Sequence, residues 1–536
     1  MPPSTTLAAD LPGRAATRAR AATITTAAGG ALLLLMALGM YRPWESQPFD
    51  ILDFSEFLPL LTGSDGFIGR FTALVRHYYT EQGRFNVLTY AGLAMKWTIL
   101  GDDASAWYLL RFSLMLAITG GSFALLRRLG ASTIAAASGA TLFLVANTAS
   151  VAFTRLTMAE PLGLAMLLIA SHVAAGFQSS RAWRRDAAVI AGALVLAILA
   201  KEMMLACAPF VLLLATSRRA DGSFGPPRVD ARAIRLAVVT ALACGAALVP
   251  VGLAALGASS ESFTASYGTT SLTPMWYVEL VGRMMLLQPL LFPGNLLLAI
   301  VLLTGLTVAL RHGDRRETWT RVALAASLPL TGALLYLPWP KFEHFYGLPF
   351  LLAPAILLAT ALAAIDRRWP RGAWVANGAV ILALLFHGLN ATQGARESAA
   401  RRAVNAKVAG ILATSPRGDT IVVASPYRVR QAWQGTGPTL SRYAAATHAG
   451  VARRPAVDVP CTEGGRRYKF GLGSAVLVSY SDMCGSLPRT DVTVREPYSY
   501  IDWATMSVRR DSLRADVLFP PPARQAPPPP GEVRRE

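Results

Sequence analysis

The sequence predicts a polytopic α-helical membrane protein with about eleven transmembrane helices and a small C-terminal α/β domain. Hydrophobic residues make up 53% of the 536 residues and charged residues only 15%, against about 25% charged in average soluble proteins. Long apolar runs alternate with short Arg-rich clusters, the pattern of a chain that crosses a bilayer repeatedly. The net charge of +19 therefore reflects arginines in loops between spans, and a nucleic-acid partner is not expected.

Eleven apolar runs reach or approach the roughly 20 helical residues that a bilayer core requires. They are 22–40, 105–126, 131–150, 160–178, 187–200, 203–217, 235–256, 289–310, 322–338, 347–365 and 372–390. The first run follows Arg14, Arg18 and Arg20 and lacks a small-residue cleavage site. We therefore expect a retained helix and not a removed signal peptide.

The runs 187–200 and 203–217 are each short, and they flank Lys201 and Glu202. They form either one long helix or a tight hairpin. With the N-terminus in the cytoplasm and a hairpin at Lys201, 20 arginines fall in the short inside segments and nine Lys and Arg residues on the outer face before residue 391. A single helix would invert every later loop and break this bias, so the positive-inside rule favours the hairpin.

This topology predicts the domain organisation. Residues 1–21 form a cytoplasmic segment, and residues 22–390 form a transmembrane module with a first outer loop at 41–104. The outer face also receives the segments 151–159, 201–202, 257–288 and 339–346.

The rest of the chain follows the last span on the outer face. TIVVAS (420–425) and SAVLVSY (474–480) are typical strand sequences, so residues 391–518 are expected to form an extracytoplasmic α/β domain. Cys461 and Cys484 in this domain are candidates for a disulfide in an oxidising compartment. The Pro-rich tail, 519–536, is expected to be disordered.

Three carboxylates, Asp50, Asp53 and Glu56, lie in the stretch FDILDFSEF just after the first span. Asp53 and Glu56 are three residues apart and would share one face of a helix. A carboxylate near apolar walls has a raised pKa and can act as a general base, and neighbouring carboxylates can hold a divalent cation. The alternative is that the three acids keep an interfacial helix at the water boundary.

Further charged residues fall on the predicted outer face. Glu160-Pro161 is a plausible helix start, with Arg155 one loop away as a partner. Lys201 beside apolar helices indicates an anion site or a partnered charge, unless it snorkels to the interface. Lys341 and His344 lie within four residues and could grip a phosphate.

Four segments of the chain resemble a known family. They are DILDFSE (50–56), QGRFNVLTY (82–90) with LGDDASAWYLLR (100–111), LAKEM (199–203) and PKFEHFYGLPF (340–350). They follow one another in the same order as the motifs of GT-C-fold glycosyltransferases of the family 39 type, and all fall on the same predicted side of the membrane. This family includes protein mannosyltransferases and the lipid A aminoarabinose transferase. The resemblance covers about residues 22–365.

The resemblance implies an inverting hexosyl- or pentosyltransferase in a bacterial inner membrane, with its active site on the extracytoplasmic face. A polyprenyl-phosphate-linked sugar would be the donor, and a hydroxyl of a glycan, lipid or protein the acceptor. Asp53 would be the catalytic base, with Asp50 and Glu56 as alternates. The lipid phosphate would face Arg155, Lys201, Lys341 and His344. A divalent metal ion held by Asp53 and Glu160 is the one cofactor implied.

Other functions remain open at this stage. A glycan polymerase or ligase on the same scaffold would show the same segments. A lipid or solute transporter is a further alternative, although transporters often carry matching broken helices in two halves and this chain shows one broken pair. A catalytically inactive scaffold for other envelope enzymes is the last.

Overall fold

The computed structural model describes residues 34–35, 37–42, 57–81, 83–257, 274–286, 292–335, 344–415, 420–425, 436–448, 454–460, 475–480, 491–502 and 507–519. The chain divides into two compact units. Unit 1 is Met1–Ser46 with Val75–Ala395, and unit 2 is Gln47–Leu74 with Arg396–Glu536. The domain boundaries expected from the sequence stay predictions.

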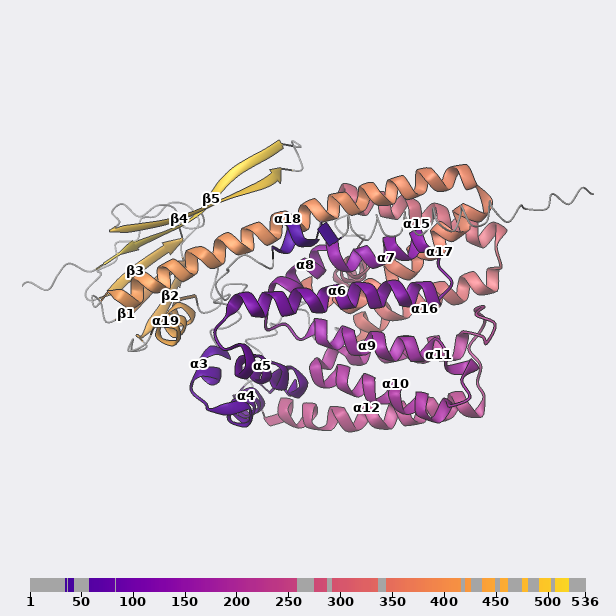
Figure 1. Ribbon diagram of the computed structural model, residues 1–536, viewed down its shortest axis with the longest axis horizontal. Coiled ribbons are helices and arrows are strands. Elements are labelled where there is room, and N and C mark those ends of the chain that lie inside the picture. Colours follow the sequence, from indigo (N-terminus) through magenta and orange to yellow (C-terminus); the bar gives the residue numbers. More distant parts are fainter. Residues whose placement is uncertain are drawn as a thin grey trace, which may run out of the picture. The chain divides into compact units, whose positions relative to one another are not determined.

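Unit 1 is a helical bundle (Figure 1). Its helices, several of them short 3-10 segments (η), are α5 (Val87–Leu100), α6 (Ala104–Arg128), α7 (Thr133–Val145), α8 (Asn147–Thr154), α9 (Glu160–Ala174), η1 (Phe177–Ser179), α10 (Trp183–Ala200), η2 (Glu202–Cys207), α11 (Ala208–Ser217), α12 (Ala231–Gly257), α14 (Pro274–Met284), α15 (Pro293–His312), α16 (Arg315–Leu335), η3 (His344–Leu351) and α17 (Leu352–Arg368). Helix α3 (Phe57–Thr62) belongs to unit 2, whereas α4 (Gly66–Glu81) and α18 (Pro370–Thr414) run from one unit into the other.

Helices occur at every predicted apolar run after the first, most of which lies outside the described residues. Five described helices are long and apolar enough to cross a membrane, or six if the bent pair α7–α8 is one span. By length and composition, the described helices therefore do not reach the predicted number of eleven transmembrane spans. Helix α9 has 15 residues and is shorter than a bilayer core requires. Helix α10 has 18 but begins with the charged residues Arg184, Arg185 and Asp186.

Two boundaries differ from the sequence prediction. The run 131–150 is broken at Ala146, whose backbone is extended, and its halves meet at 51°. The last run was expected to end at residue 390, but α18 continues to Thr414. The residues after 390 are rich in Ala, a strong helix former, and Glu397 and Arg401 form an i,i+4 ion pair of 2.6 Å there. The end of an apolar run therefore does not mark the end of the helix.

The chain reverses direction at Lys201, as the arginine distribution predicts. Gln178, just before α10, donates a hydrogen bond from Nε2 to the carbonyl of Ala215 in the last turns of α11, at 3.2 Å. One continuous helix would separate these residues by about 55 Å at 1.5 Å per residue. Helix α10 and the segment η2–α11 therefore form a hairpin.

Arginines hold the loops at one end of unit 1, called here the arginine-rich end. Arg218 donates to the carbonyls of Ala175 (2.6 Å) and Arg128. Arg321 donates to Leu129 (3.0 Å) and pairs with Glu317. These guanidinium groups satisfy backbone carbonyls at helix ends, which have no partner within the helix.

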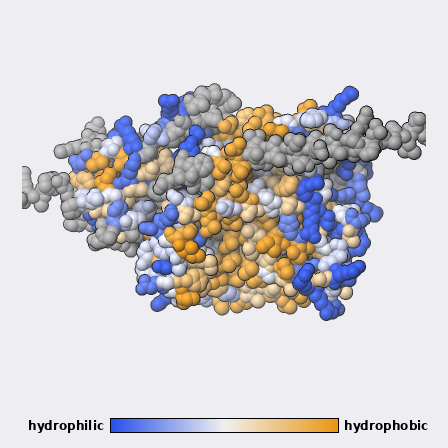
Figure 2. Space-filling model, viewed as in Figure 1, coloured by the Kyte–Doolittle hydropathy of each residue, from blue (hydrophilic) through white to orange (hydrophobic). Residues whose placement is uncertain are grey.

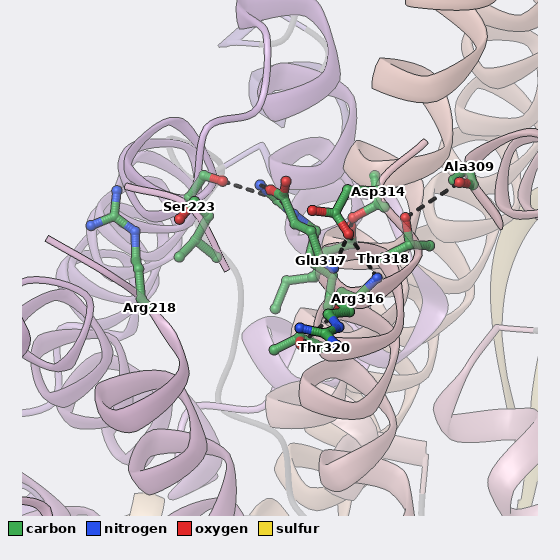
Figure 3. A network of polar contacts seen from close by, with 12 residues as sticks. Arg218, Ser223, Ala309, Asp314, Arg316, Glu317, Thr318 and Thr320 are labelled. Atoms are coloured by element: carbon green, nitrogen blue, oxygen red, sulfur yellow. Dashed lines mark hydrogen bonds and ion pairs between the residues drawn. The ribbon is translucent and has the colours of Figure 1, made fainter. Parts of the chain in front are cut away.

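The start of α16 at the same end is capped by a side chain. Figure 3 shows Asp314, whose Oδ1 accepts hydrogen bonds from the backbone N–H groups of Arg316 (2.8 Å) and Glu317 (3.2 Å). Thr318 donates back to the carbonyl of Ala309 at the end of α15, at 3.5 Å. Together these bonds close the turn between α15 and α16.

Helix α17 lies at the centre of unit 1 and packs against α7, α15 and α16. Almost every residue from Leu352 to Ile365 is buried. A Cβ added at Gly305 of α15 would lie 2.6 Å from the Cα of Ala361, so this crossing requires glycine. The outer helices instead expose apolar side chains, and Figure 2 shows a broad apolar surface with hydrophilic residues on either side of it. Such a surface suits contact with lipid.

Unit 2 contains a five-stranded mixed sheet (Figure 1). The strands are β1 (Thr420–Ser425), β2 (Ala456–Pro460), β3 (Ala475–Tyr480), β4 (Val492–Asp502) and β5 (Ser507–Leu518), in the order β2-β1-β3-β5-β4. β1 is parallel to β2 and β3, whereas β5 is antiparallel to β3 and β4. Helix α19 (Thr436–Thr447) connects β1 to β2. The two predicted strands are confirmed as β1 and β3, and Cys461 and Cys484 lie outside the described residues.

Candidate functional site at the Lys201 turn

Three of the residues predicted to form the site are described with their side chains: Arg155, Glu160 and Lys201. Asp50, Asp53, Glu56 and Lys341 lie outside the described residues, and so does the side chain of His344, the first residue of η3. The roles assigned to all eight residues stay predictions.

Lys201 interrupts the helical hairpin at the end far from the arginine-rich end. Its backbone is extended, with φ −156° and ψ 119°, between the end of α10 and the start of η2. The backbone polar groups at this break are satisfied, because Thr89 of α5 donates to the carbonyl of Ala200 at 2.9 Å and Met204 donates to the carbonyl of Lys201 at 2.9 Å. Hydrogen bonds from neighbouring segments thus stabilise the break.

The Lys201 ammonium is buried, with 7% of the residue exposed. Its Nζ lies 3.4 Å from Oε1 of Glu202 and 5.3 Å from the ring centre of Tyr346 in η3. Burial acts to lower the pKa of Lys201, but the nearby Glu202, Tyr346 and Glu160 act more strongly and raise it above its ordinary value. The side chain is therefore a permanent positive charge inside a largely apolar bundle.

Glu160, the first residue of α9, is the second buried ionisable group at the turn, and burial raises the pKa of its carboxyl. It is 1% exposed and interacts electrostatically with Lys201, Glu202 and Arg111. Within the described part of the chain, neither its Oε2 nor that of Glu202 has a hydrogen-bond partner. Buried polar atoms in native proteins are nearly always hydrogen-bonded. Two such oxygens beside one lysine indicate a place for a polar ligand, a cation or water.

Two basic side chains that the sequence did not assign to the site, Arg111 and Lys96, position the loop before Glu160. Arg111 of α6 is buried and donates from Nη2 to the carbonyls of Arg155 (2.6 Å) and Met158 (2.8 Å). Lys96 of α5 donates to the carbonyl of Leu156 at 3.3 Å. Arg111 is the last residue of LGDDASAWYLLR, one of the segments that resemble the glycosyltransferase family. These two hydrogen bonds go to backbone carbonyls, so they position the loop.

Arg84 and Tyr90, from the segment QGRFNVLTY, also approach the turn. Both interact electrostatically with Lys201 and Glu202. Tyr90 stacks on Tyr78 with ring centres 5.0 Å apart, and the N–H of Arg84 donates to the carbonyl of Tyr78 at 2.9 Å. Arg84 was not among the predicted site residues, and its side chain adds a second cation near Lys201.

A close contact holds α9 against η2 beside these charges. A Cβ added at Gly163 would lie 2.8 Å from Cε and 2.9 Å from Cγ of Met204. Gly163 is one turn after Glu160, and Met204 is three residues after Lys201. The missing side chain therefore lets α9 approach η2 closely beside Glu160 and Lys201.

No family model and no curated protein matches this chain. Solved structures that it resembles include the arabinofuranosyltransferase AftD from Mycobacteria (TM-score 0.49, 16% identity, 92% of this chain and 39% of AftD). Others are ArnT from Cupriavidus metallidurans bound to undecaprenyl phosphate (0.47, 16%, 90% and 97%) and the Archaeoglobus fulgidus oligosaccharyltransferase with zinc and sulfate (0.44, 12%, 84% and 68%). The chain thus spans about two fifths of the length of AftD.

These neighbours are GT-C glycosyltransferases, the class that the sequence motifs resemble. Each TM-score lies below 0.5.

A metal ion finds only part of a binding site in the described residues. No group of three or more His, Cys, Asp and Glu side chains there could hold a metal. Glu160 offers one unpaired carboxylate oxygen, but the positive Lys201 and Arg111 act on it as well. Asp53, the other predicted ligand, lies outside the described residues, so the metal stays a prediction.

Proposed function

We propose that this chain is a membrane glycosyltransferase that moves a sugar from a polyprenyl-phosphate donor to an acceptor hydroxyl on the extracytoplasmic face. The observation that carries this proposal is the buried Lys201, paired with Glu202, at a break between two helices. A buried charge inside a membrane protein is costly and marks a functional site by default. The Nζ of Lys201 lies 3.4 Å from Oε1 of Glu202, and because an ammonium group carries three donors, the lysine can also bind an anionic ligand.

A phosphate is the anion that this environment favours. Lys201 and Arg84 supply two positive charges, and the ring of Tyr346 lines one side of the ammonium. The apolar walls reduce screening, which strengthens each charge interaction. Arg155, Lys341 and His344 are proposed to add to this phosphate site.

The proposed reaction is a displacement at the anomeric carbon. A carboxylate of the first loop, Asp53 with Asp50 and Glu56 as alternates, takes the proton of the acceptor hydroxyl. The acceptor oxygen then forms a bond to the anomeric carbon while the bond from that carbon to the phosphate oxygen breaks. The configuration inverts, and the electron pair leaves with the lipid phosphate, whose added negative charge Lys201 stabilises.

A divalent cation, if bound by Asp53 and Glu160, would supply positive charge near the reacting groups. None of the steps proposed above requires this cation. The orphan oxygen of Glu160 supports its place at the site with or without a metal.

The test is transfer from purified polyprenyl-phosphate sugars to added acceptors, with release of lipid phosphate measured in parallel. We expect Lys201→Gln to abolish release and transfer, whereas Lys407→Gln, an exposed lysine of unit 2, leaves both unchanged. Lipid profiling of a deletion strain identifies the donor, because the unused polyprenyl-phosphate sugar accumulates. Full activity of Lys201→Gln, or unaltered lipid-linked sugars in the deletion strain, contradicts the proposal.

A further inference from the structure

Three arginines surround one tryptophan at the arginine-rich end of unit 1. The Cζ atoms of Arg184, Arg235 and Arg232 lie 5.6, 5.7 and 6.0 Å from the ring centre of Trp183. Trp183 and Arg184 begin α10, whereas Arg232 and Arg235 lie in the first turns of α12. These four residues are called the Trp183 cluster below.

The three positive charges are not neutralised by acids of the described chain. No ion pair joins any of the three to an acid among the described residues. Asp186 lies 3.6 Å from Arg185 instead, and the carboxylate of Asp230 accepts the backbone N–H of Ala233 at 2.8 Å, at the start of α12. Each guanidinium lies within 6.0 Å of the centre of the same ring, so three positive charges that repel one another are gathered in one region. An anion bound among them would relieve this repulsion.

An apolar surface continues from the cluster along the same helices. On α12, Ile234, Val238 and Leu242 follow at four-residue spacing and are 51%, 50% and 70% exposed. Residues four apart share one helix face, so the three form a stripe. Helices α10 and α12 lie side by side (Figure 1), and α10 exposes Val189 and Leu196. The cluster thus stands at the head of an exposed apolar surface.

We propose that the Trp183 cluster binds the headgroup of an anionic phospholipid, whose acyl chains lie along the exposed stripe of α12. Guanidinium groups bind phosphate through charge-assisted hydrogen bonds, and basic residues beside membrane helices attract anionic lipids. Tryptophan is enriched at the level of the headgroups. Charge alone would suit any anion, but the apolar stripe selects one that carries chains.

This site is independent of the proposed sugar transfer. Trp183 begins α10 and Lys201 follows its end, about 27 Å away at 1.5 Å per residue. Loss of the lipid site therefore leaves the charges at Lys201 in place.

The experiment uses the full chain in nanodiscs prepared with equal amounts of phosphatidylglycerol and phosphatidylethanolamine. Lipids that stay with the protein after transfer to detergent are measured by mass spectrometry. We expect the wild type to retain more phosphatidylglycerol than phosphatidylethanolamine. In the double variant Arg232→Gln/Arg235→Gln this enrichment should fall by about tenfold. The control is Arg311→Gln/Arg316→Gln, which removes the same charge at the same end from exposed residues with no ring contact in the described chain.

Three results would overturn the proposal. They are unchanged enrichment in the Arg232→Gln/Arg235→Gln variant, an equal loss in the control, and displacement of the lipid by millimolar inorganic phosphate, which would assign the site to a free anion. If the double variant does not fold, the single variant Arg235→Gln is used, for which we expect an intermediate loss.

Discussion

Gly163→Ala should displace the segment that carries Lys201. The added methyl carbon would lie 2.9 Å from Cγ of Met204, against about 3.5–4.0 Å for an ordinary carbon–carbon contact. Met204 therefore has to move by about 0.5–1 Å, and its Cγ is too near the backbone to move alone. Met204 is fully buried, so the overpacking should cost about 1–3 kcal/mol.

A double-mutant cycle isolates this contact. Met204→Ala alone should cost about 2–5 kcal/mol through the cavity it leaves. In the double variant the methyl group added at position 163 enters that cavity, so the combined loss should fall short of the sum by at least about 1 kcal/mol. Gly192→Ala on α10 is the control, since an added Cβ there meets nothing within 4 Å.

Thermal unfolding in detergent and sugar transfer are measured on all variants. We expect Gly163→Ala to reduce transfer more than its loss of stability explains, and the double variant to recover part of the transfer. If the two substitutions are additive in both assays, the contact does not set the position of Lys201.

Three further outcomes follow from contacts near the site. Thr89→Val should cost about 1–2 kcal/mol, because the buried carbonyl of Ala200 loses its donor, and thermal unfolding should show Thr89→Ser close to wild type. Arg111→Gln should cost about 3 kcal/mol and lower transfer, because the loop before Glu160 loses two charged hydrogen bonds; recovery by Arg111→Lys in the same assays would argue against a role for the two-bond geometry. Since the pKa of Lys201 is raised, its stabilising charge is fully present below about pH 10 and is lost only as pH rises above that, so donor binding measured by calorimetry should not weaken between about pH 6 and pH 9 through this group.

Helix positions were largely predictable, because an apolar run in lipid has to satisfy its backbone hydrogen bonds within the run, as a helix does. The hairpin at Lys201 also followed from the sequence, since the distribution of arginines depends on topology and not on packing. The end of α18 did not follow, because a helix of Ala-rich sequence extends beyond the apolar run. Nor did the break at Ala146, which no Pro or Gly marks.

The candidate site was predictable only as a set of residues. Glu160 and Lys201 were named from the sequence because a charge beside apolar runs is costly. Arg84 was not, because it lies in a polar loop where arginine is ordinary. Lys96 and Arg111 were not assigned to the site either, and their hydrogen bonds hold carbonyls of the loop 155–159.

The sequence by itself determined that this chain is helical, apolar and asymmetric in charge, since these properties are sums over local composition. Only the tertiary structure decided that Glu160, Lys201 and Tyr346 meet at one turn. These residues come from separate helices far apart in the chain. Their approach depends on interhelical contacts such as Gly163 with Met204, which no local pattern encodes.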